Sequence, residues 1–265
     1  MINNCCIVRF DEIGLKAAHT KNEFVKLLTT QMKKIFPADK VKSSPYRLII
    51  FSKNVKKAAM LASKVFGVNS VSPALMIEPD IKLMKKAAYS LYRKGKSFRI
   101  SCQRSDKDYY LNSEEICRQV GHYVYERGGK VDLKNFETNI QIDLFNKKAF
   151  IFREKIKGFG GLPAGCQGKI ACLMNNDRDY LACLMMMNRG CLPIIIGKKK
   201  FYDKLAKNFG YLKIQHFKEL KYSNYSAMVC GNDYKELLKG FSCPIFYPLA
   251  FIEKSYAKEK FKAIN

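Results

Sequence analysis

The stretch from Lys155 to Cys191 decides the fold of this chain. Residues 155–169 read Lys-Ile-Lys-Gly-Phe-Gly-Gly-Leu-Pro-Ala-Gly-Cys-Gln-Gly-Lys, a glycine-rich joint, and residues 170–174 form a short apolar strand. Asn-Asn-Asp-Arg-Asp follows at 175–179, and residues 180–187 predict a helix that is apolar on nearly every side. Such a helix is buried under a sheet, and a strand, a loop and a helix in this order open a nucleotide-binding α/β domain.

The residues after this stretch predict a parallel sheet. Cys191 to Ile196 is wholly apolar, as strands of parallel sheets are. Residues 227–230 and 245–249 predict two more central strands, and a final helix is expected to start near Glu253. We therefore predict a third domain over residues 165–265.

The front of the chain predicts a ferredoxin-like domain over residues 1–76. Strands are expected at 5–10, 46–51 and 68–76, and helices at about 20–36 and 54–66. Thr20 and Glu23 have the spacing of a capping box, Pro37 ends the first helix, and Gly67 ends the second. These three strands and two helices suggest the β-α-β-β-α-β unit of a ferredoxin-like domain, which has one strand more.

A second domain is predicted over residues 77–164. Asp80 is expected to cap one helix, and Asn112 with Glu115 to open another. Strands are expected at 97–102, 139–145 and 149–153, and the polar residues 103–107 form a loop after the first of them.

The composition favours a nucleic-acid partner. The chain has 265 residues with 48 Lys and Arg against 23 Asp and Glu, a net charge of +25. Such an excess attracts an anionic partner, with nucleic acid first and an acidic membrane surface second. A lysine-rich genome that makes every surface basic is the alternative explanation. No apolar run nears the roughly 20 residues that cross a membrane, no signal peptide is evident, and the ten scattered cysteines fit a reducing cytoplasm rather than a zinc or disulfide framework.

Four stretches resemble the tRNA 4-thiouridine synthetase family, also called the ThiI family. They are residues 9–16 (Arg-Phe-Asp-Glu-Ile-Gly-Leu-Lys), the joint from Phe152 to Gly168, residues 188–191 (Asn-Arg-Gly-Cys), and Gly231 followed by Pro248, Leu249 and Lys254. The resemblance runs through nearly the whole chain, and the joint is its most specific part. It implies a ferredoxin-like domain and a THUMP RNA-binding domain, an α+β front half, followed here by a shortened α/β PP-loop domain with a parallel sheet.

The resemblance also implies an activity. In the family, the first two domains hold tRNA, the THUMP domain engages its acceptor end, and the PP-loop domain adenylates one uridine with ATP before a persulfide sulfur displaces AMP. The family loop reads Ser-Gly-Gly-x-Asp-Ser, and Met174 to Asp179 stands in its place. Both glycines are replaced by Asn175 and Asn176, whose side chains crowd the phosphate position, while Asp177 and Asp179 bring negative charge.

The predicted nucleotide site is therefore degenerate. Its remaining residues would be Cys172, Leu173, Asn175, Asn176, Gly197, Lys198 and Gly231. ATP and Mg²⁺ are expected only if this site survives; no metal site is predicted and no catalytic residue is assigned. Lys198 to Lys200 would be either the last basic cluster for ATP or a solvated turn. Cys230 and Cys243 hold positions open to a persulfide, but their strand-edge places favour structural roles.

RNA binding is predicted for the polar loop, the helix behind it and the path into the joint. The residues are Gln103, Arg104, Lys107, Arg118, Arg153, Lys155 and Lys157. Tyr109 and Tyr110 would either stack on unpaired nucleotides or pack on the domain. Glu12 and Lys16 would be either solvated turn charges or contacts to the tRNA backbone.

The residues and the resemblance together predict a tRNA-binding protein whose ATP site has decayed. The alternatives are an active tRNA 4-thiouridine sulfurtransferase and a third domain that serves only as an interaction module. A catalytic or sulfur-donor protein is a further expected partner, and a homodimer is left open.

Overall fold

A computed structural model describes residues 3–10, 12–44, 46–219, 225–232, 243–252 and 254–262. The chain divides into two compact units, each built from separate segments. The first unit comprises Met1–Ile7, Ile49–Met60 and Val71–Ile156. The second comprises Val8–Leu48, Leu61–Ser70 and Lys157–Asn265. Both units contain segments from the first predicted domain, so their bounds do not coincide with those of the three predicted sequential domains. That division stays a prediction.

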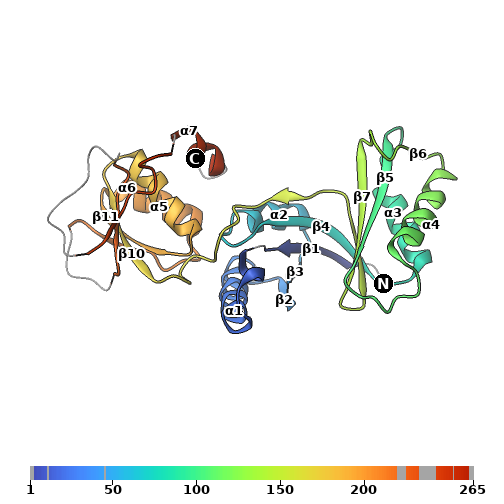
Figure 1. Ribbon diagram of the computed structural model, residues 1–265, viewed down its shortest axis with the longest axis horizontal. Coiled ribbons are helices and arrows are strands. Elements are labelled where there is room, and N and C mark those ends of the chain that lie inside the picture. The colour runs from blue at the N-terminus through green and yellow to red at the C-terminus, as the bar shows by residue number, and fades with distance from the viewer. Residues whose placement is uncertain are drawn as a thin grey trace. The chain divides into compact units, whose positions relative to one another are not determined.

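The front of the chain follows the predicted β-α-β-β-α-β order (Figure 1). Its elements are β1 (Asn3–Arg9), η1 (Glu12–Leu15), α1 (Ala18–Ile35), β2 (Lys40–Ser44), β3 (Arg47–Phe51), α2 (Val55–Ser63) and β4 (Ser70–Ile77). The predicted capping box at Thr20 and Glu23 is wrong. Helix α1 already begins at Ala18, and its N-cap, Ala17, has no side-chain hydrogen bond. The pattern did not predict β2, because its residues are mostly polar and exposed.

The second predicted domain contains two helices and a mixed sheet. Its elements are α3 (Ile81–Leu91), β5 (Ser97–Arg104), α4 (Ser113–Tyr125), β6 (Lys130–Val131), β7 (Thr138–Phe145) and β8 (Lys148–Phe152). Asp80 accepts a hydrogen bond from the N–H of Leu83 at 2.8 Å, and Asn112 forms the expected capping box with Glu115. Both predicted helix starts are confirmed.

Strand pairing joins the first two predicted domains. The strand order is β2-β3-β1-β4-β8-β7-β5-β6, and β9 (Ile156–Lys157) pairs with β4. β4 and β8 are antiparallel, with Leu75 opposite Ile151. β5 and β7 are parallel, and β7 turns into β8 through Asn146 and Lys147, both with a φ of 53°. The side chains of α3 and α4 pack with β5, β7 and β8 around one buried core.

Within its described residues, the third predicted domain has a parallel five-stranded sheet in the order β12-β11-β10-β13-β14. Its elements are β10 (Lys169–Met174), α5 (Asp177–Asn188), β11 (Leu192–Gly197), α6 (Lys199–Phe209), β12 (Gln215–Phe217), β13 (Met228–Val229), β14 (Ile245–Phe246) and α7 (Lys254–Lys260). The parallel sheet confirms the predicted fold class. The expected helix start near Glu253 lies outside the described residues.

Helix α6 shows what surrounds the basic cluster at residues 198–200, for which an ATP contact and a solvated turn were both left open. Lys198 is the residue before α6, and Lys199 and Lys200 form its first turn. Phe201, Leu205 and Phe209 are buried at intervals of four residues, the spacing of one helix face. The basic cluster is therefore the start of an amphipathic helix, and the apolar residues behind it were the missed signal.

The glycine-rich joint is explained by close packing inside the second unit. A Cβ atom on Gly161 would lie 2.0 Å from the carbonyl oxygen of Asn188, and one on Gly158 would lie 2.1 Å from that of Val68. Gly161 also has a φ of +73°, which side chains disfavour. Glycine is therefore required here by close backbone approach.

Three features of the described residues bear on function. No helix among them combines the length and apolar character needed to span a membrane. They also contain no group of three or more His, Cys, Asp or Glu side chains that could hold a metal ion. All ten cysteines lie within the described ranges, and none forms a disulfide.

Candidate functional site

The loop between β10 and α5 lies at the carboxyl end of the parallel sheet, where ligands bind in open α/β folds. Asn175 and Asn176 link the strand to the helix. Lys198 donates from Nζ to the carbonyl oxygen of Asn175 at 2.8 Å. Gly231 follows β13, and a Cβ atom there would lie 2.5 Å from the backbone of Arg178. The fold thus brings Asn175, Gly231 and Lys198 to one edge of the sheet.

The backbone N–H groups of this loop donate hydrogen bonds to the side-chain oxygens of Asp179 and Asn176. Asp179 accepts through Oδ2 from the backbone N–H of Asn175 at 3.0 Å and of Asn176 at 3.2 Å. Asn176 accepts through Oδ1 from the N–H of Arg178 at 2.8 Å and of Asp179 at 3.1 Å. This reciprocal arrangement is a capping box. An internal carboxylate thus takes main-chain donors of the kind that a phosphate-binding loop presents to its ligand.

Asp179 also fastens the loop to the neighbouring strand. Its side chain is buried, and Oδ1 accepts from the N–H of Gly231 at 2.8 Å. The thiol of Cys230 lies 3.7 Å from the same oxygen. Sequence reasoning placed Asp179 only as a like charge facing phosphate. Its structural role could have been inferred from the Asn-x-x-Asp spacing of a helix start.

The guanidinium of Arg178 donates hydrogen bonds to two backbone carbonyls of the chain. Nε donates to the carbonyl oxygen of Gly231, and Nη2 donates to that of Leu249 at 2.8 Å. A guanidinium held in this way does not offset the charge of an added phosphate without giving up these contacts.

The cysteines near the site are set in apolar surroundings. Cys172 is fully buried in β10, and burial raises the pKa of its thiol well above its ordinary value. Burial, helped by the carboxylate of Asp179, also raises the pKa of Cys230. A raised thiol pKa disfavours the reactive thiolate. These surroundings favour structural roles for both residues, and Leu173 is half-buried beside a small apolar cluster.

Two of the seven residues predicted to bind RNA hold the protein's own backbone. Arg104 donates from Nη1 to the carbonyl oxygens of Tyr109 at 2.9 Å and Leu111 at 2.6 Å. Arg153 donates to the carbonyl oxygen of Leu91 at 3.2 Å. Neither role was visible in the sequence, because both partners are carbonyls that any residue could supply.

The other predicted RNA-binding residues are exposed. They are Gln103, Lys107, Arg118, Lys155 and Lys157. Arg118 is 72% exposed and lies 3.8 Å from Glu114, an ion pair too open to hold the side chain firmly. Tyr110 is 71% exposed, whereas Tyr109 is half-buried against the core, and burial raises its pKa. Of the two tyrosines, Tyr110 is therefore the one placed to stack on a base.

We expect Arg104→Gln to loosen the loop rather than to remove an RNA contact directly. Loss of two hydrogen bonds from a charged donor should lower the free energy of unfolding by about 2 kcal/mol. Amide hydrogen exchange should rise in residues 105–111. The exposed neighbour Gln103 supplies the control, because Gln103→Ala should leave exchange in this loop unchanged. Unaltered exchange in Arg104→Gln would contradict the structural role.

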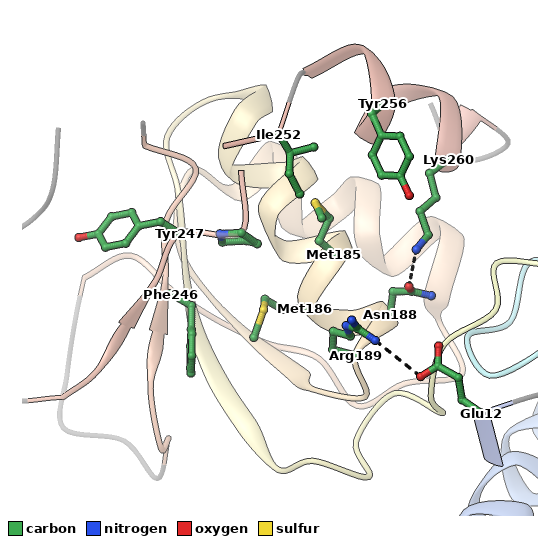
Figure 2. A pocket seen from close by; sticks show the side chains of 11 residues that line it. Glu12, Met185, Met186, Asn188, Arg189, Phe246, Tyr247, Ile252, Tyr256 and Lys260 are labelled. Atoms are coloured by element: carbon green, nitrogen blue, oxygen red, sulfur yellow. Dashed lines mark hydrogen bonds and ion pairs between the residues drawn. The ribbon is translucent and has the colours of Figure 1, made fainter. Parts of the chain in front are cut away.

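A groove that the sequence did not predict lies between α5 and α7 (Figure 2). It has a volume of about 640 Å³. The residues that define this α5–α7 groove include Glu12, Met185, Met186, Arg189, Phe246, Tyr256 and Lys260. Glu12 lies 3.6 Å from Arg189 and keeps 41% of its side chain exposed, so the two residues form an ion pair at the surface.

Comparison with known proteins places these features in a family. Residues 5–72 match the ThiI ferredoxin-like domain, and residues 80–154 match the THUMP domain. A "Probable tRNA sulfurtransferase" of Thermococcus kodakarensis is 31% identical over 232 residues, which are 81% of this chain and 61% of that protein. The chain thus spans less than two thirds of the length of this relative.

Two solved structures have a similar fold. The PH1313 protein of Pyrococcus horikoshii OT3 matches with a TM-score of 0.84 and 27% identity, over 98% of this chain and 99% of that chain. A 4-thiouridine synthetase, solved in a complex with RNA and bound ATP, matches with a TM-score of 0.81 over 99% of this chain and 85% of that chain. The identity to this second protein is 19%, so the likeness concerns the fold alone.

Proposed function

This chain belongs to the ThiI family of THUMP-domain proteins, and from that premise we propose that it binds the acceptor region of tRNA without using ATP. The THUMP match and the net charge of +25 support the RNA-binding part. The exposed residues Lys107, Arg118 and Lys155 are the phosphate contacts that we assign to the first unit.

The single observation that carries the second part is the engagement of the β10–α5 loop by Asp179. A triphosphate would have to displace a buried carboxylate that accepts three backbone hydrogen bonds. It would also meet that negative charge at close range, with Arg178 already held by two carbonyls. These residues do not fit ATP, and we assign no chemical step to a nucleotide at this loop.

On this proposal, a separate catalytic or sulfur-donor protein carries out the activation of the uridine and the transfer of sulfur. The buried, high-pKa surroundings of Cys172 and Cys230 argue against either as a sulfur carrier. The tRNA sulfurtransferase that matches this chain is longer than it, so that protein's whole activity does not transfer by similarity alone. The chain would then present tRNA to its partner.

The test compares tRNA binding with ATP turnover on the same preparation. We expect unmodified tRNA transcripts to bind at moderate salt, with an affinity that falls steeply as salt rises because phosphate contacts release counterions. ATP–pyrophosphate exchange should stay at the level of a blank. A relative with an intact Ser-Gly-Gly-x-Asp-Ser loop is the positive control for exchange. Robust exchange by this chain would instead favour an active sulfurtransferase, and salt-insensitive or absent tRNA binding would refute the RNA-binding part.

A further inference from the structure

Three cations, Arg189, Lys260 and Lys157, lie near the C-terminal end of α5. Among the described residues, Glu12 is the carboxylate that pairs with one of them, Arg189. Lys260 donates from Nζ to Oδ1 of Asn188 at 2.7 Å, a neutral partner. Asn188 is buried, and its Nδ2 donates to the carbonyl oxygens of Phe159 at 3.1 Å and Gly160 at 2.9 Å, which fixes the amide. The ammonium of Lys260 is therefore held in place by a group that does not neutralise it.

The surroundings of Lys260 have an excess of positive charge. Partial burial lowers the pKa of Lys260, and the charges of Arg189 and Lys157 lower it further, while Glu12 acts in the opposite direction. Of the described residues that line the α5–α7 groove, Glu12 is the only carboxylate, and it lies 3.6 Å from Arg189. An added anion would relieve the repulsion between these cations.

These cations are not needed to cap α5. The last carbonyls of the helix already accept main-chain N–H groups, since Leu162 donates to Asn188 at 2.9 Å and Gly190 donates to Met187 at 3.0 Å. Lys260 thus keeps its charge for a ligand, and Arg189 can share its charge with one, since it is 70% exposed in its ion pair with Glu12.

Aromatic surface lies beside the cations in the same groove. Tyr256 is 57% exposed and Phe246 is 47% exposed. Figure 2 shows Tyr256 and Lys260 extending from α7 toward the last turn of α5, with Met186 between Phe246 and Arg189. Exposed aromatic rings next to cations are the pattern by which proteins bind unpaired nucleotides. The volume of about 640 Å³ lies in the range of small-ligand sites.

A second cavity extends the cationic side. It has a volume of about 800 Å³, shares Glu12, Tyr256 and Lys260 with the groove, and reaches Lys157 and the glycines of the joint. Glu259 and Lys262 also line it, so its described lining has three lysines and two carboxylates. Lys157, predicted from sequence to contact RNA, therefore lies on a path that continues to Lys260.

We infer that the α5–α7 groove binds an unpaired segment of RNA, with phosphates at Arg189, Lys260 and Lys157, one base against Tyr256 and another against Phe246 at the other end of the groove. This inference rests on the proposed tRNA binding and adds a second RNA contact, in the third domain. Paired RNA hides its base faces, so the groove selects single strands over duplex.

The experiment measures fluorescence anisotropy of the full chain with two probes, a labelled single-stranded hexanucleotide RNA and a labelled RNA duplex. The double variant Arg189→Gln/Lys260→Gln should bind the hexanucleotide about tenfold more weakly. The salt slope should fall by about 1.4, from roughly 0.7 for each of two single-strand phosphates. Duplex binding should change less than about twofold. Tyr256→Leu should weaken hexanucleotide binding about fivefold or more, whereas Tyr256→Phe should bind like the wild type, because the ring is kept.

The matched control is Lys207→Gln/Lys258→Gln, which removes two exposed charges from α6 and α7 outside the groove. The same loss of affinity in this control would overturn the inference, since binding would then follow net charge. Unchanged hexanucleotide binding in the groove variants would also overturn the inference. If these variants in addition changed the oligomeric state, the groove would be a contact between protein chains. Failure of wild-type tRNA binding would count separately, against the proposed function.

Discussion

Replacing Asp179 with alanine is expected to lower the free energy of unfolding by about 3 kcal/mol. The buried carboxylate accepts the N–H groups of Asn175, Asn176 and Gly231 at 3.0, 3.2 and 2.8 Å. A hydrogen bond to a charged group contributes about 1.5–3 kcal/mol, and a buried donor left without a partner costs about 1–3 kcal/mol. Asn175 and Asn176 are exposed, so water can reach their N–H groups after the substitution, but Gly231 is buried. The expected loss of about 3 kcal/mol is therefore smaller than three times the cost of one buried hydrogen bond to a charged group.

Urea denaturation measures this effect, with Asp177→Ala as the matched control. Asp177 lies two residues earlier in the same helix turn and is exposed, so its removal should cost less than about 0.5 kcal/mol. Asp179→Asn should lie between the two variants, because an amide keeps an acceptor oxygen but loses the charge. If Asp179→Ala unfolds at the wild-type urea concentration, Asp179 does not hold the loop, and the main argument against ATP binding is lost.

Changing Lys107, Arg118 and Lys155 together to glutamine is expected to weaken tRNA binding about a hundredfold at moderate salt. All three side chains are exposed in the first unit. Each lost duplex phosphate contact should reduce the salt slope by about 0.9, so the triple variant should lose roughly 2.7. Arg104 and Arg153 are left out, because their substitution would disturb the backbone that they hold.

The control for this variant is Lys82→Gln/Lys86→Gln/Lys94→Gln, which removes the same charge from exposed positions on α3 and the turn after it. It should weaken binding less than about threefold. Equal losses in the two triple variants would mean that tRNA responds to the net charge of +25 rather than to a defined surface. Filter binding across a salt series supplies both the affinities and the slopes.

Several sequence predictions held because they depend on local chemistry. The helix starts at Asp80 and Asn112 follow from side chains that cap their own helices, and the apolar run at 192–196 reports a strand covered on both faces. The predicted start of α1 was wrong because Thr20 and Glu23, which have the spacing of a capping box, lie inside the helix that begins at Ala18. Helix α6 was missed because three lysines at its start suggested an exposed turn.

Residue type and spacing along the chain were enough to predict the fold class, the replacement of both glycines of the family loop, and most helices and strands in their order, but not β2, α6 or β12. Only the tertiary structure shows which side chain accepts the hydrogen bonds of the loop between β10 and α5. Asp179 meets Gly231, and Lys260 meets Asn188, over separations of 52 and 72 residues. Such pairs form only when strands and helices distant in the chain are packed together, and the Asp179 bond to a backbone N–H could be made with almost any partner residue. The sequence therefore showed that the phosphate loop had changed, and the fold showed that a carboxylate of the chain itself holds it closed.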